Sequence, residues 1–496
     1  MKHAGEEVRA LTKTLRLLII YIYKQISEPL SSIICKWFNT SVRCGLFPNS
    51  FKTSRIVPIF KGGNNNCKTN YRPICTIEFI AKIIEKLMYR RLYSFLNLNN
   101  VLSVHQFGFQ KGLNTSDALA EFSDIVYNSI NKNNTLIAVY LDFSRAFDTV
   151  NIDIMLKKLE HYGVRGPVNC WFASYLRDRN YYVNIGDAES SLYKLNIGVP
   201  QGSCLGPLLF ILYINDLYVS CPNLNLVHYA DDTTAFISGS DPYILVNSLN
   251  VDLQSIHKWL QCNRLTLNVK KSAYMIFGNN NFVPNLKIGN ETVSKVDEAK
   301  FLGIIIDSKL TFKHHFENVL KKLSSVSGII FRNRDYIPRK VLRMLYLSLG
   351  WSYLTYGIVV WGKSSVTFGN KIQAMQNRIM RSIFGSSDKQ IYKTNYLLNF
   401  EQSYMYFAVI KLYKEINTNI TPYFSNRIAS FQSNHQHNTR FTVNNNLVPP
   451  LFNRSKCQSS FIYQSIKFWN NLPPEIKSSD NVELFTRKLK NHLISN

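Results

Sequence analysis

The segment LVHYADDTTAFIS, residues 226–238, decides the fold of this 496-residue chain. Its first half is apolar and aromatic and its second half is rich in Thr, Phe and Ile, as expected for two β-strands. The two runs meet at Asp231 and Asp232, so we predict a hairpin whose turn presents two carboxylates. Adjacent carboxylates repel each other, and a divalent metal ion is the usual compensation. A solvated polar turn would give the same pattern, and that alternative stays open at this point.

A third carboxylate follows a strand of a different kind. Residues 136–141, LIAVYL, form a continuous apolar run, which is typical of a central strand buried on both faces. Asp142 comes directly after this run, where the scaffold can fix the position of a metal ligand or catalytic carboxylate. A helix N-cap is the competing interpretation of Asp142. Together with Asp231 and Asp232, Asp142 would complete a cluster able to bind two metal ions.

The composition points to a polyanionic partner. The chain has 58 Lys and Arg residues against 32 Asp and Glu residues, a formal charge of +26. Such an excess favours nucleic acid over a small metabolite, and we expect no membrane association because no concentrated basic amphipathic helix stands out. The nine cysteines lack zinc-ligand spacing, so we predict no zinc site and an intracellular protein of the cytoplasm or nucleus that is not secreted.

The length and the pattern of elements predict several domains, because 496 residues exceed one compact core. Residues 1–40 read as a helical N-terminal segment, in which the apolar run 15–23 is too short to span a membrane. Mixed helix and strand patterns fill residues 41–307, and helical patterns fill 308–385. Residues 386–496 form a C-terminal region without an assigned role.

Two glycine-containing loops are further candidates for ligand binding. KTSRIVPIFKGG, residues 52–63, reads as a strand that ends at two glycines, and NYRPI follows at 70–74. The cations Arg55, Lys61 and Arg72 could grip a triphosphate, although ordinary edge structure explains the pattern equally well. GVPQGS, residues 198–203, opens an apolar helix, and its backbone could approach a ligand closely with Gln201 free to donate or accept. A plain helix entry turn is the alternative.

Eight motifs in order carry a resemblance to a known family. LDFSRAFDTV (141–150), GVPQGSCLGPLLFILYINDL (198–217) and YADD (229–232) resemble successive motifs of reverse transcriptases. With FKTSRIVPIFKGG, NYRPI, HQFGFQKG, LNVKKS and AKFLGIII, the set is similar to jockey-type non-LTR (LINE-like) retrotransposons over about residues 25–385. The resemblance extends weakly to WSYLTYGIVVWG (351–362) and KFWNNLPPEIK (467–477). It implies an α+β right-hand polymerase with fingers and a ferredoxin-like palm in 41–307, a helical thumb in 308–385 and a mostly helical C-terminal extension.

The resemblance also implies roles for individual residues. The metal-binding catalytic carboxylates would be Asp142, Asp231 and Asp232, with Mg²⁺ as the cofactor and Mn²⁺ as a possible substitute. By the same resemblance, Phe147 would be the steric gate against the 2′-hydroxyl, and Gln201 would lie beside the incoming nucleotide. Lys61 and Arg72 would face its triphosphate, and Lys271 would protonate pyrophosphate. The primer grip would consist of Phe301, Leu302 and Gly303.

The expected function is RNA-directed DNA polymerisation by two-metal nucleotidyl transfer. The partners would be an RNA template, a DNA primer and deoxynucleoside triphosphates. No segment resembles the upstream endonuclease of complete elements, so we expect no nicking of target DNA, and a catalytically idle nucleic-acid-binding remnant is the alternative function. An RNA-dependent RNA polymerase is disfavoured by the bulky Phe147, which would exclude ribonucleotides.

Overall fold

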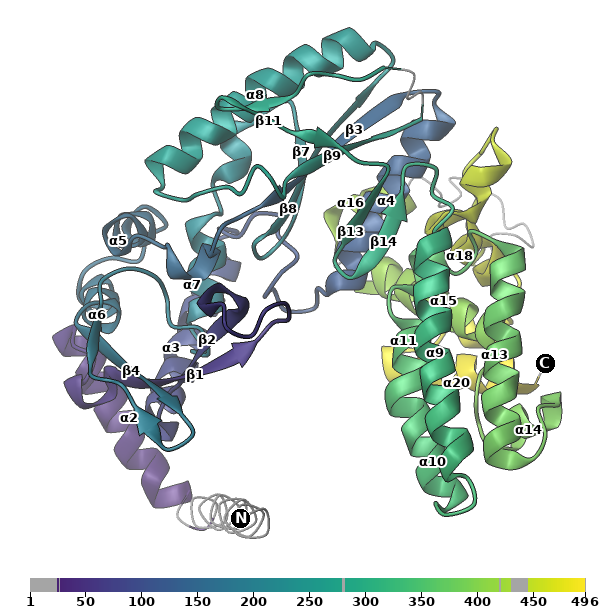
Figure 1. The fold of residues 1–496 in the computed structure, drawn as a ribbon, viewed down its shortest axis with the longest axis horizontal. Coiled ribbons are helices and arrows are strands. Elements are labelled where there is room, and N and C mark those ends of the chain that lie inside the picture. The colour runs from purple at the N-terminus through teal and green to yellow at the C-terminus, as the bar shows by residue number, and fades with distance from the viewer. Residues whose placement is uncertain (1–24, 26, 279–281, 419–420, 430–444, 496) are drawn as a thin grey trace. The chain divides into compact units, whose positions relative to one another are not determined.

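A computed structural model describes residues 25, 27–278, 282–418, 421–429 and 445–495 (Figure 1). The chain forms two compact units. The first contains residues 1–102, 145–215 and 263–265, and the second contains 103–144, 216–262 and 266–496. Of the predicted N-terminal helical segment, residues 1–24 and 26 lie outside the described residues, and α2 covers Ser27–Cys44. The predicted domain boundaries differ from this division and stay predictions.

The first unit contains a mixed sheet of five strands in the order β2-β1-β4-β5, with β6 paired to β4. β1 is antiparallel to β2 and parallel to β4. Aromatic side chains pack together in this unit: the centroid of the Phe47 ring lies 5.4 Å from that of Trp171 and 5.1 Å from that of Tyr175. The elements are α2 (Ser27–Cys44), η1 (Asn49–Phe51), β1 (Thr53–Phe60), η2 (Lys68–Asn70), β2 (Tyr71–Thr76), α3 (Phe79–Leu98), η3 (Ala146–Asp148), α5 (Ile152–His161), α6 (Pro167–Leu176), β4 (Arg179–Ile185), β5 (Ala188–Glu189), β6 (Tyr193–Leu195) and α7 (Gly206–Tyr213).

The second unit is built on a five-stranded sheet in the order β12-β9-β3-β8-β7. The central strand β3 (Thr135–Asp142) is antiparallel to both of its neighbours, and its residues 135–139 are buried, which confirms the predicted central strand. The other strands are β7 (Asn225–Tyr229), β8 (Asp232–Gly239), β9 (Ala273–Phe277) and β12 (Ser294–Lys295).

Helices α4 (Thr115–Asn131) and α8 (Pro242–Cys262) cover opposite faces of this second sheet (Figure 1). Alternate residues of a strand point to opposite faces. Phe236 of β8 meets Phe122 of α4 at 5.6 Å between ring centroids, whereas Gly239, three residues further along β8, lies against Leu245 of α8. The sheet is therefore buried on both faces, which explains the unbroken apolar run in β3.

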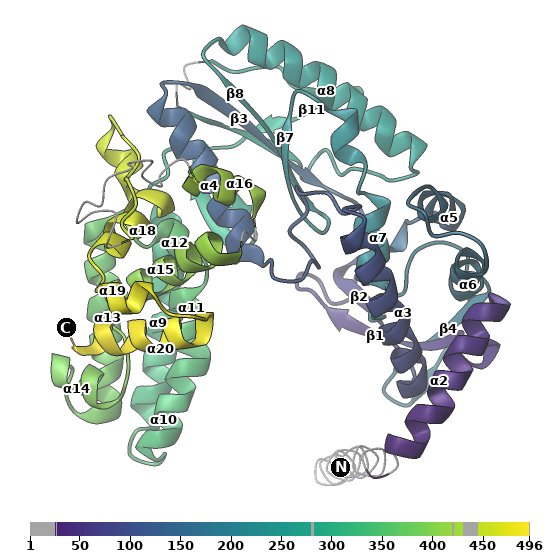
Figure 2. The ribbon, with the colours of Figure 1, turned by 180° about the vertical axis from the view of Figure 1, so that it is seen from behind.

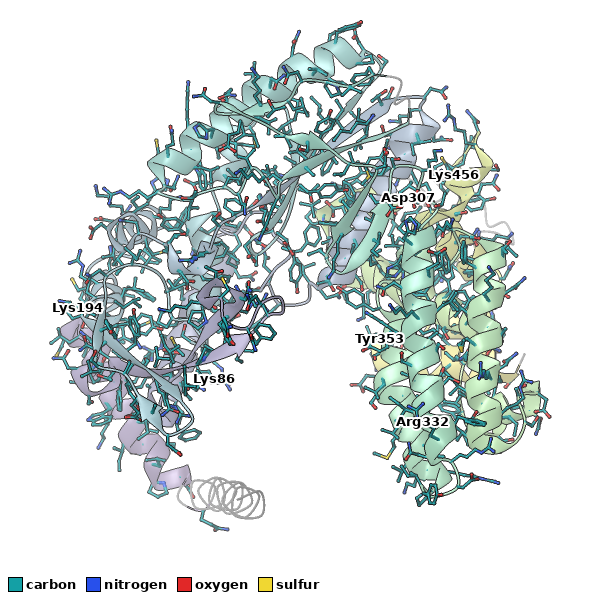
Figure 3. All side chains as sticks on the ribbon, viewed as in Figure 1. Lys86, Lys194, Asp307, Arg332, Tyr353 and Lys456 are labelled. Carbon is teal, nitrogen blue, oxygen red and sulfur yellow. The ribbon has the colours of Figure 1, made fainter. Side chains whose placement is uncertain are left out.

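The chain becomes helical after the hairpin β13 (Glu298–Phe301) and β14 (Ile304–Asp307). The carboxylate of Asp307, labelled in Figure 3, accepts hydrogen bonds from the backbone N–H groups of Lys309, Thr311 and Phe312 and so turns the chain into the next helix. The following elements are α9 (Lys313–Asn333), α10 (Arg339–Leu345), the π-helical turn η5 (Tyr346–Trp351), α11 (Ser352–Thr355), α12 (Ile358–Trp361) and α13 (Val366–Phe384). The remaining short elements of this unit are η4 (Leu217–Ser220), β10 (Lys287–Ile288) and β11 (Glu291–Thr292).

The C-terminal helices share one hydrophobic core with α4, α9 and α13 (Figure 2). Trp361 joins the two groups, because its ring lies 5.0 Å from that of Phe316 in α9 and 5.8 Å from that of Phe400 in α15. The C-terminal elements are α14 (Lys389–Thr394), α15 (Phe400–Thr418), α16 (Pro422–Ala429), η6 (Ser455–Ser459), α18 (Phe461–Asn470), α19 (Pro474–Lys477) and α20 (Val482–Ser495). The predicted α+β class is confirmed, and within the described residues no helix has the length and apolar character needed to cross a membrane.

Buried ion pairs connect α4 with the C-terminal helices. Lys411 Nζ of α15 lies 2.5 Å from Asp117 Oδ1 of α4 and 3.3 Å from Glu415 Oε1, and all three side chains are largely buried. Arg427 Nε of α16 lies 2.6 Å from Asp124 Oδ2 of α4. Buried charges are costly unless they are paired, so these contacts set the position of the C-terminal helices on α4.

Candidate active site

The predicted hairpin at the two aspartates is confirmed by strands β7 and β8. Tyr229 pairs with Asp232, which leaves Ala230 and Asp231 as a two-residue turn. Ala230 has φ +57°, and a positive φ at the first turn position matches the right-handed twist of the flanking strands. This conformation costs an alanine roughly 1 kcal/mol relative to glycine, so the surrounding structure must favour it.

Asp142 lies opposite Asp232 in the register of β3 and β8. Side chains directly opposite each other on antiparallel strands have Cβ atoms about 5 Å apart, and Asp231 is adjacent in the turn. The helix-cap alternative for Asp142 is wrong, because Arg145 precedes η3 and Asn151 caps α5. The sheet register therefore places two carboxylates side by side at the end of the central strand, with the third beside them in sequence.

Burial and the repulsion between neighbouring carboxylates both raise the pKa of Asp232. Partial burial of its carboxyl group, then the negative charges of Asp231 and Asp142, raise the pKa of Asp232 to about 6, while the ammonium of Lys300 opposes this shift. In the described part of the chain, no group of three or more His, Cys, Asp or Glu side chains is arranged so that it could hold a metal ion. Carboxylate oxygens are hard ligands, and Mg²⁺ is commonly bound by one or two carboxylates together with waters and substrate phosphates. Asp142 and Asp232, which lie opposite each other in the sheet register, fit such an open site.

The loop that carries Lys271 is attached to the backbone of the central strand. The Asp142 N–H donates to Ser272 Oγ at 3.1 Å, and the Asp142 carbonyl accepts from the Asn268 N–H at 2.8 Å. Phe143 forms a bridge with Leu267 in the same loop. Lys271 is exposed and directly precedes Ser272, which is hydrogen-bonded to Asp142. The loop therefore holds an exposed ammonium group next to the end of β3.

The predicted primer grip forms the tight turn between β13 and β14. Leu302 and Gly303 both have positive φ, +45° and +86°, and the buried Phe301 ring lies 6.0 Å from that of Tyr140 in β3. The Tyr356 hydroxyl donates to the Leu302 carbonyl at 2.5 Å. The turn is therefore attached to the sheet on one side and to the helical region on the other.

The remaining predicted site residues belong to the first unit. The Phe147 ring of η3 stacks on that of Phe210 in α7, with the centroids 4.4 Å apart. Gln201 donates from Nε2 to Asp148 Oδ1 at 2.7 Å, and its backbone carbonyl accepts from the Cys75 N–H at 2.7 Å. A Cβ on Gly202 would lie 2.4 Å from the Cys75 carbonyl oxygen, so this close approach requires glycine.

The two predicted triphosphate cations lie on the hairpin of β1 and β2. The Lys61 N–H, just after β1, donates to the Asn70 carbonyl at 2.8 Å, and Arg72 pairs with Ile59. Burial raises the pKa of Asp148, and the Gln201 amide, Arg145 and then the charge of Lys61 oppose this shift. Within the first unit, Phe147, Gln201 and Lys61 are thus grouped around Asp148.

Similarity to known proteins identifies the family. Residues 59–306, half of the chain, match the model described as reverse transcriptase (RNA-dependent DNA polymerase). The chain belongs to the reverse transcriptase family. It is 28% identical over 369 residues to a probable RNA-directed DNA polymerase from transposon BS of Drosophila melanogaster, covering 70% of this chain and 40% of that protein. It is 27% identical to the RNA-directed DNA polymerase from mobile element jockey of the same species, covering 70% of this chain and 39% of that protein.

These relatives confirm the resemblance to reverse transcriptases of jockey-type elements, and this chain spans about 40% of their length. Among solved structures, apo telomerase from Candida tropicalis is similar with a TM-score of 0.38 and 13% identity, over 80% of this chain and 74% of that one. Dependence on divalent metal ions is general in this family.

Three residues that contact or act on the predicted site residues were missed in the sequence. Asp148 accepts a hydrogen bond from Gln201 and directly follows Phe147 in the motif LDFSRAFDTV. The charge of Lys300 lowers the pKa of Asp232, and Lys300 directly precedes the predicted primer grip in the motif AKFLGIII. Tyr356 belongs to WSYLTYGIVVWG and is 54 residues further along the chain than Leu302, whose carbonyl accepts its hydrogen bond. The first two could have been found by their place in the motifs. Tyr356 could not, because its partner is distant in sequence.

Proposed function

We propose that this chain is an RNA-directed DNA polymerase that adds deoxynucleotides to the 3′-end of a primer. The observation that carries the proposal is the register of Asp142 opposite Asp232, with Asp231 in the adjoining turn, in a chain of the reverse transcriptase family. The net charge of +26 supports a nucleic-acid template and primer as partners, since backbone phosphates dominate such affinity. We place the activity inside the cell, in the cytoplasm or nucleus.

The three aspartates would bind the metal ions, with Mg²⁺ as the expected ion and Mn²⁺ as a substitute. Bound divalent ions lower the pKa of an attacking hydroxyl and stabilise a departing pyrophosphate. Asp232 contributes most when its carboxyl is ionised, and the metal charge would offset the repulsion from Asp142 and Asp231. The exposed ammonium of Lys271 would donate a proton to the leaving pyrophosphate.

The first unit would supply the contacts to the incoming nucleotide. The Phe147 ring is supported from behind by Phe210, so it could resist displacement by a 2′-hydroxyl and favour deoxyribose. Lys61 and Arg72 would pair with the triphosphate, and Gln201 would lie beside the nucleotide. In the second unit, the turn at Phe301, Leu302 and Gly303 would contact the primer, and α9 to α13 would contact the duplex.

Primer extension on an RNA template with deoxynucleotides and Mg²⁺ tests the proposal. Asp142→Asn and Asp231→Asn should each reduce extension ~100-fold or more, because metal stabilisation of the reaction is worth several kcal/mol. Asp335→Asn is the matched control, since Asp335 is exposed and, among the described residues, its one ion pair is with its neighbour Arg334 at 3.6 Å. No extension by the parent protein, or equal extension by Asp231→Asn, would refute the proposal. Template binding without extension would instead favour the idle nucleic-acid-binding protein.

A further inference from the structure

The loop HQFGFQ, residues 105–110, lies along the edge strand of the catalytic hairpin. The Phe107 N–H donates to the His228 carbonyl at 2.7 Å, and the His228 N–H donates to the His105 carbonyl at 2.8 Å. Gln106 and His228 are paired in parallel as an isolated bridge. The loop thus pairs with β7 on the side away from β8, close to the turn that carries Asp231.

The side chain of Gln106 reaches the turn itself. Its Oε1 accepts from the Gly108 N–H at 2.8 Å and from the Ala230 N–H at 3.0 Å. Gln106 is 3% exposed and Ala230 is 5% exposed, so water has little access to either group. An amide oxygen has two lone pairs, and both are used here to join the loop to the turn.

The backbone of the loop and that of the turn are in direct contact at Gly108. A Cβ at this position would lie 2.4 Å from the Ala230 nitrogen and 3.0 Å from the Tyr229 carbonyl carbon. Only glycine permits this approach without a shift of one of the two backbones. Two independent features therefore act at Ala230: the Gln106 amide oxygen accepts a hydrogen bond from its N–H, and Gly108 packs against its backbone without a side chain.

Ala230 needs such support for a physical reason. Its left-handed φ of +57° is unfavourable for an alanine, and its buried N–H lies outside the ladder, which begins with the pair Tyr229 and Asp232. Without an acceptor, the buried donor would be unsatisfied and other turn conformations would compete. Asp231 and Asp232 follow directly, so any rotation of the turn moves both carboxylates. Metal-binding constellations tolerate errors of only about 0.5 Å.

We propose that Gln106 is a positioning residue that, with Gly108, maintains the left-handed turn at Ala230 and so pre-orients Asp231 and Asp232 for metal ions. The assignment of the aspartates rests on the proposed function, whereas the support of the turn does not. Gln106 touches neither the primer nor the nucleotide in this role, and it acts through the backbone of Ala230 alone.

The test compares Gln106→Met, which removes the acceptor at similar length, with Gln106→Glu, which keeps an acceptor oxygen. Gln376→Met is the matched control, because Gln376 is also a fully buried glutamine of the second unit and bonds to Tyr346 and the Leu398 carbonyl. Gly108→Ala is a second route to the same effect if Gln106→Met folds poorly. Thermal melting shows which variants are folded.

Amide hydrogen exchange of residues 226–236, without metal or substrate, is the first readout. We expect exchange ~10-fold faster in Gln106→Met, the equivalent of one hydrogen bond, with partial or full recovery in Gln106→Glu and no change in Gln376→Met. Unchanged exchange in both Gln106→Met and Gly108→Ala would overturn the proposal.

Mn²⁺ binding, measured by electron paramagnetic resonance, is the second readout. Loss of a supporting partner typically weakens metal affinity ~10- to 100-fold, so Gln106→Met should bind Mn²⁺ at least ~10-fold more weakly than Gln376→Met, and kcat should fall with little change in the KM for template–primer. Faster exchange with unaltered Mn²⁺ affinity would overturn the positioning role. A parent protein that binds no Mn²⁺ would contradict the proposed function instead, and exchange would then decide the support of the turn by itself.

Discussion

Asp232→Asn should stabilise the metal-free protein while it abolishes extension. A pKa raised from 3.8 to about 6 corresponds to about 3 kcal/mol of unfavourable interaction for the ionised carboxyl. Asp232 is nonetheless exposed at the hairpin surface, and solvent screening reduces the expected gain to about 1 kcal/mol. Asparagine is neutral and nearly isosteric, so it removes the repulsion from Asp142 and Asp231 without leaving a cavity.

The sign of the pH dependence follows from the raised pKa. Below about pH 4 the carboxyl is protonated in both the folded and the unfolded state, so the parent and Asp232→Asn should be equally stable. As the pH rises from about 4 to about 6, the parent alone acquires the charge and loses stability, and the difference persists above pH 6. Mg²⁺ should remove most of this difference at pH 8 by stabilising the parent.

Urea unfolding in EDTA at pH 4 and pH 8 measures both effects, with primer extension run in parallel. Asp335→Asn again serves as the control, since its exposed pair should contribute little at either pH. An Asp232→Asn protein that is no more stable than the parent at pH 8 without metal would refute the reasoning, because it would show that neither burial nor the neighbouring carboxylates disfavour the ionised form of Asp232 in the folded state.

Further predictions concern the turn of the primer grip, the nucleotide site and the buried ion pairs. Tyr356→Phe removes the hydrogen bond to the Leu302 carbonyl, so the KM for template–primer should rise several-fold while the free energy of unfolding falls by only about 1 kcal/mol; an unchanged KM would contradict this role. Phe147→Ala should raise ribonucleotide incorporation relative to deoxynucleotide ~10-fold or more, as measured by single-nucleotide extension, and unaltered discrimination would remove Phe147 from the gate. Lys411→Met should destabilise the protein by about 3–5 kcal/mol, because it leaves buried carboxylates unpaired. Denaturant unfolding of this variant and of the exposed control Lys467→Met measures the loss of stability, and an equal loss in both variants would contradict the prediction.

Local patterns predicted the framework of the second sheet. The unbroken run 136–141 indicated a strand buried on both faces, and α4 and α8 do cover those faces. The hairpin at Asp231 and Asp232 followed from two strand-like runs meeting at a turn. The sequence suggested that Asp142 joins Asp231 and Asp232 in one cluster, but the position of Asp142 opposite Asp232 is given only by the sheet register.

Contacts between distant segments could not be predicted in the same way. Hydrophobic periodicity reports that a residue is buried, but it does not say which segment covers it. Gln106 looked like one polar residue in a glycine loop, although it bonds to Ala230, and Tyr356 looked like part of a helical stretch, although it bonds to the turn at Leu302. The sequence pattern also gives no sign of the two compact units, because the chain passes from one unit to the other at Arg145, within a single motif.

The buried pair between Lys411 and Asp117 matters for the design of shortened forms of this chain. Asp117 also caps the start of α4 by accepting a hydrogen bond from the Asn114 N–H, and α4 begins shortly after residues 105–108, which contact the hairpin of β7 and β8. A shortened chain that ends near residue 385 would leave Asp117 and Asp124 without the cations of Lys411 and Arg427 that pair with them. The smallest stably folded fragment should therefore extend at least through Arg427, and fragments cut between the predicted thumb and the C-terminal region should be poorly soluble, although they keep all three aspartates.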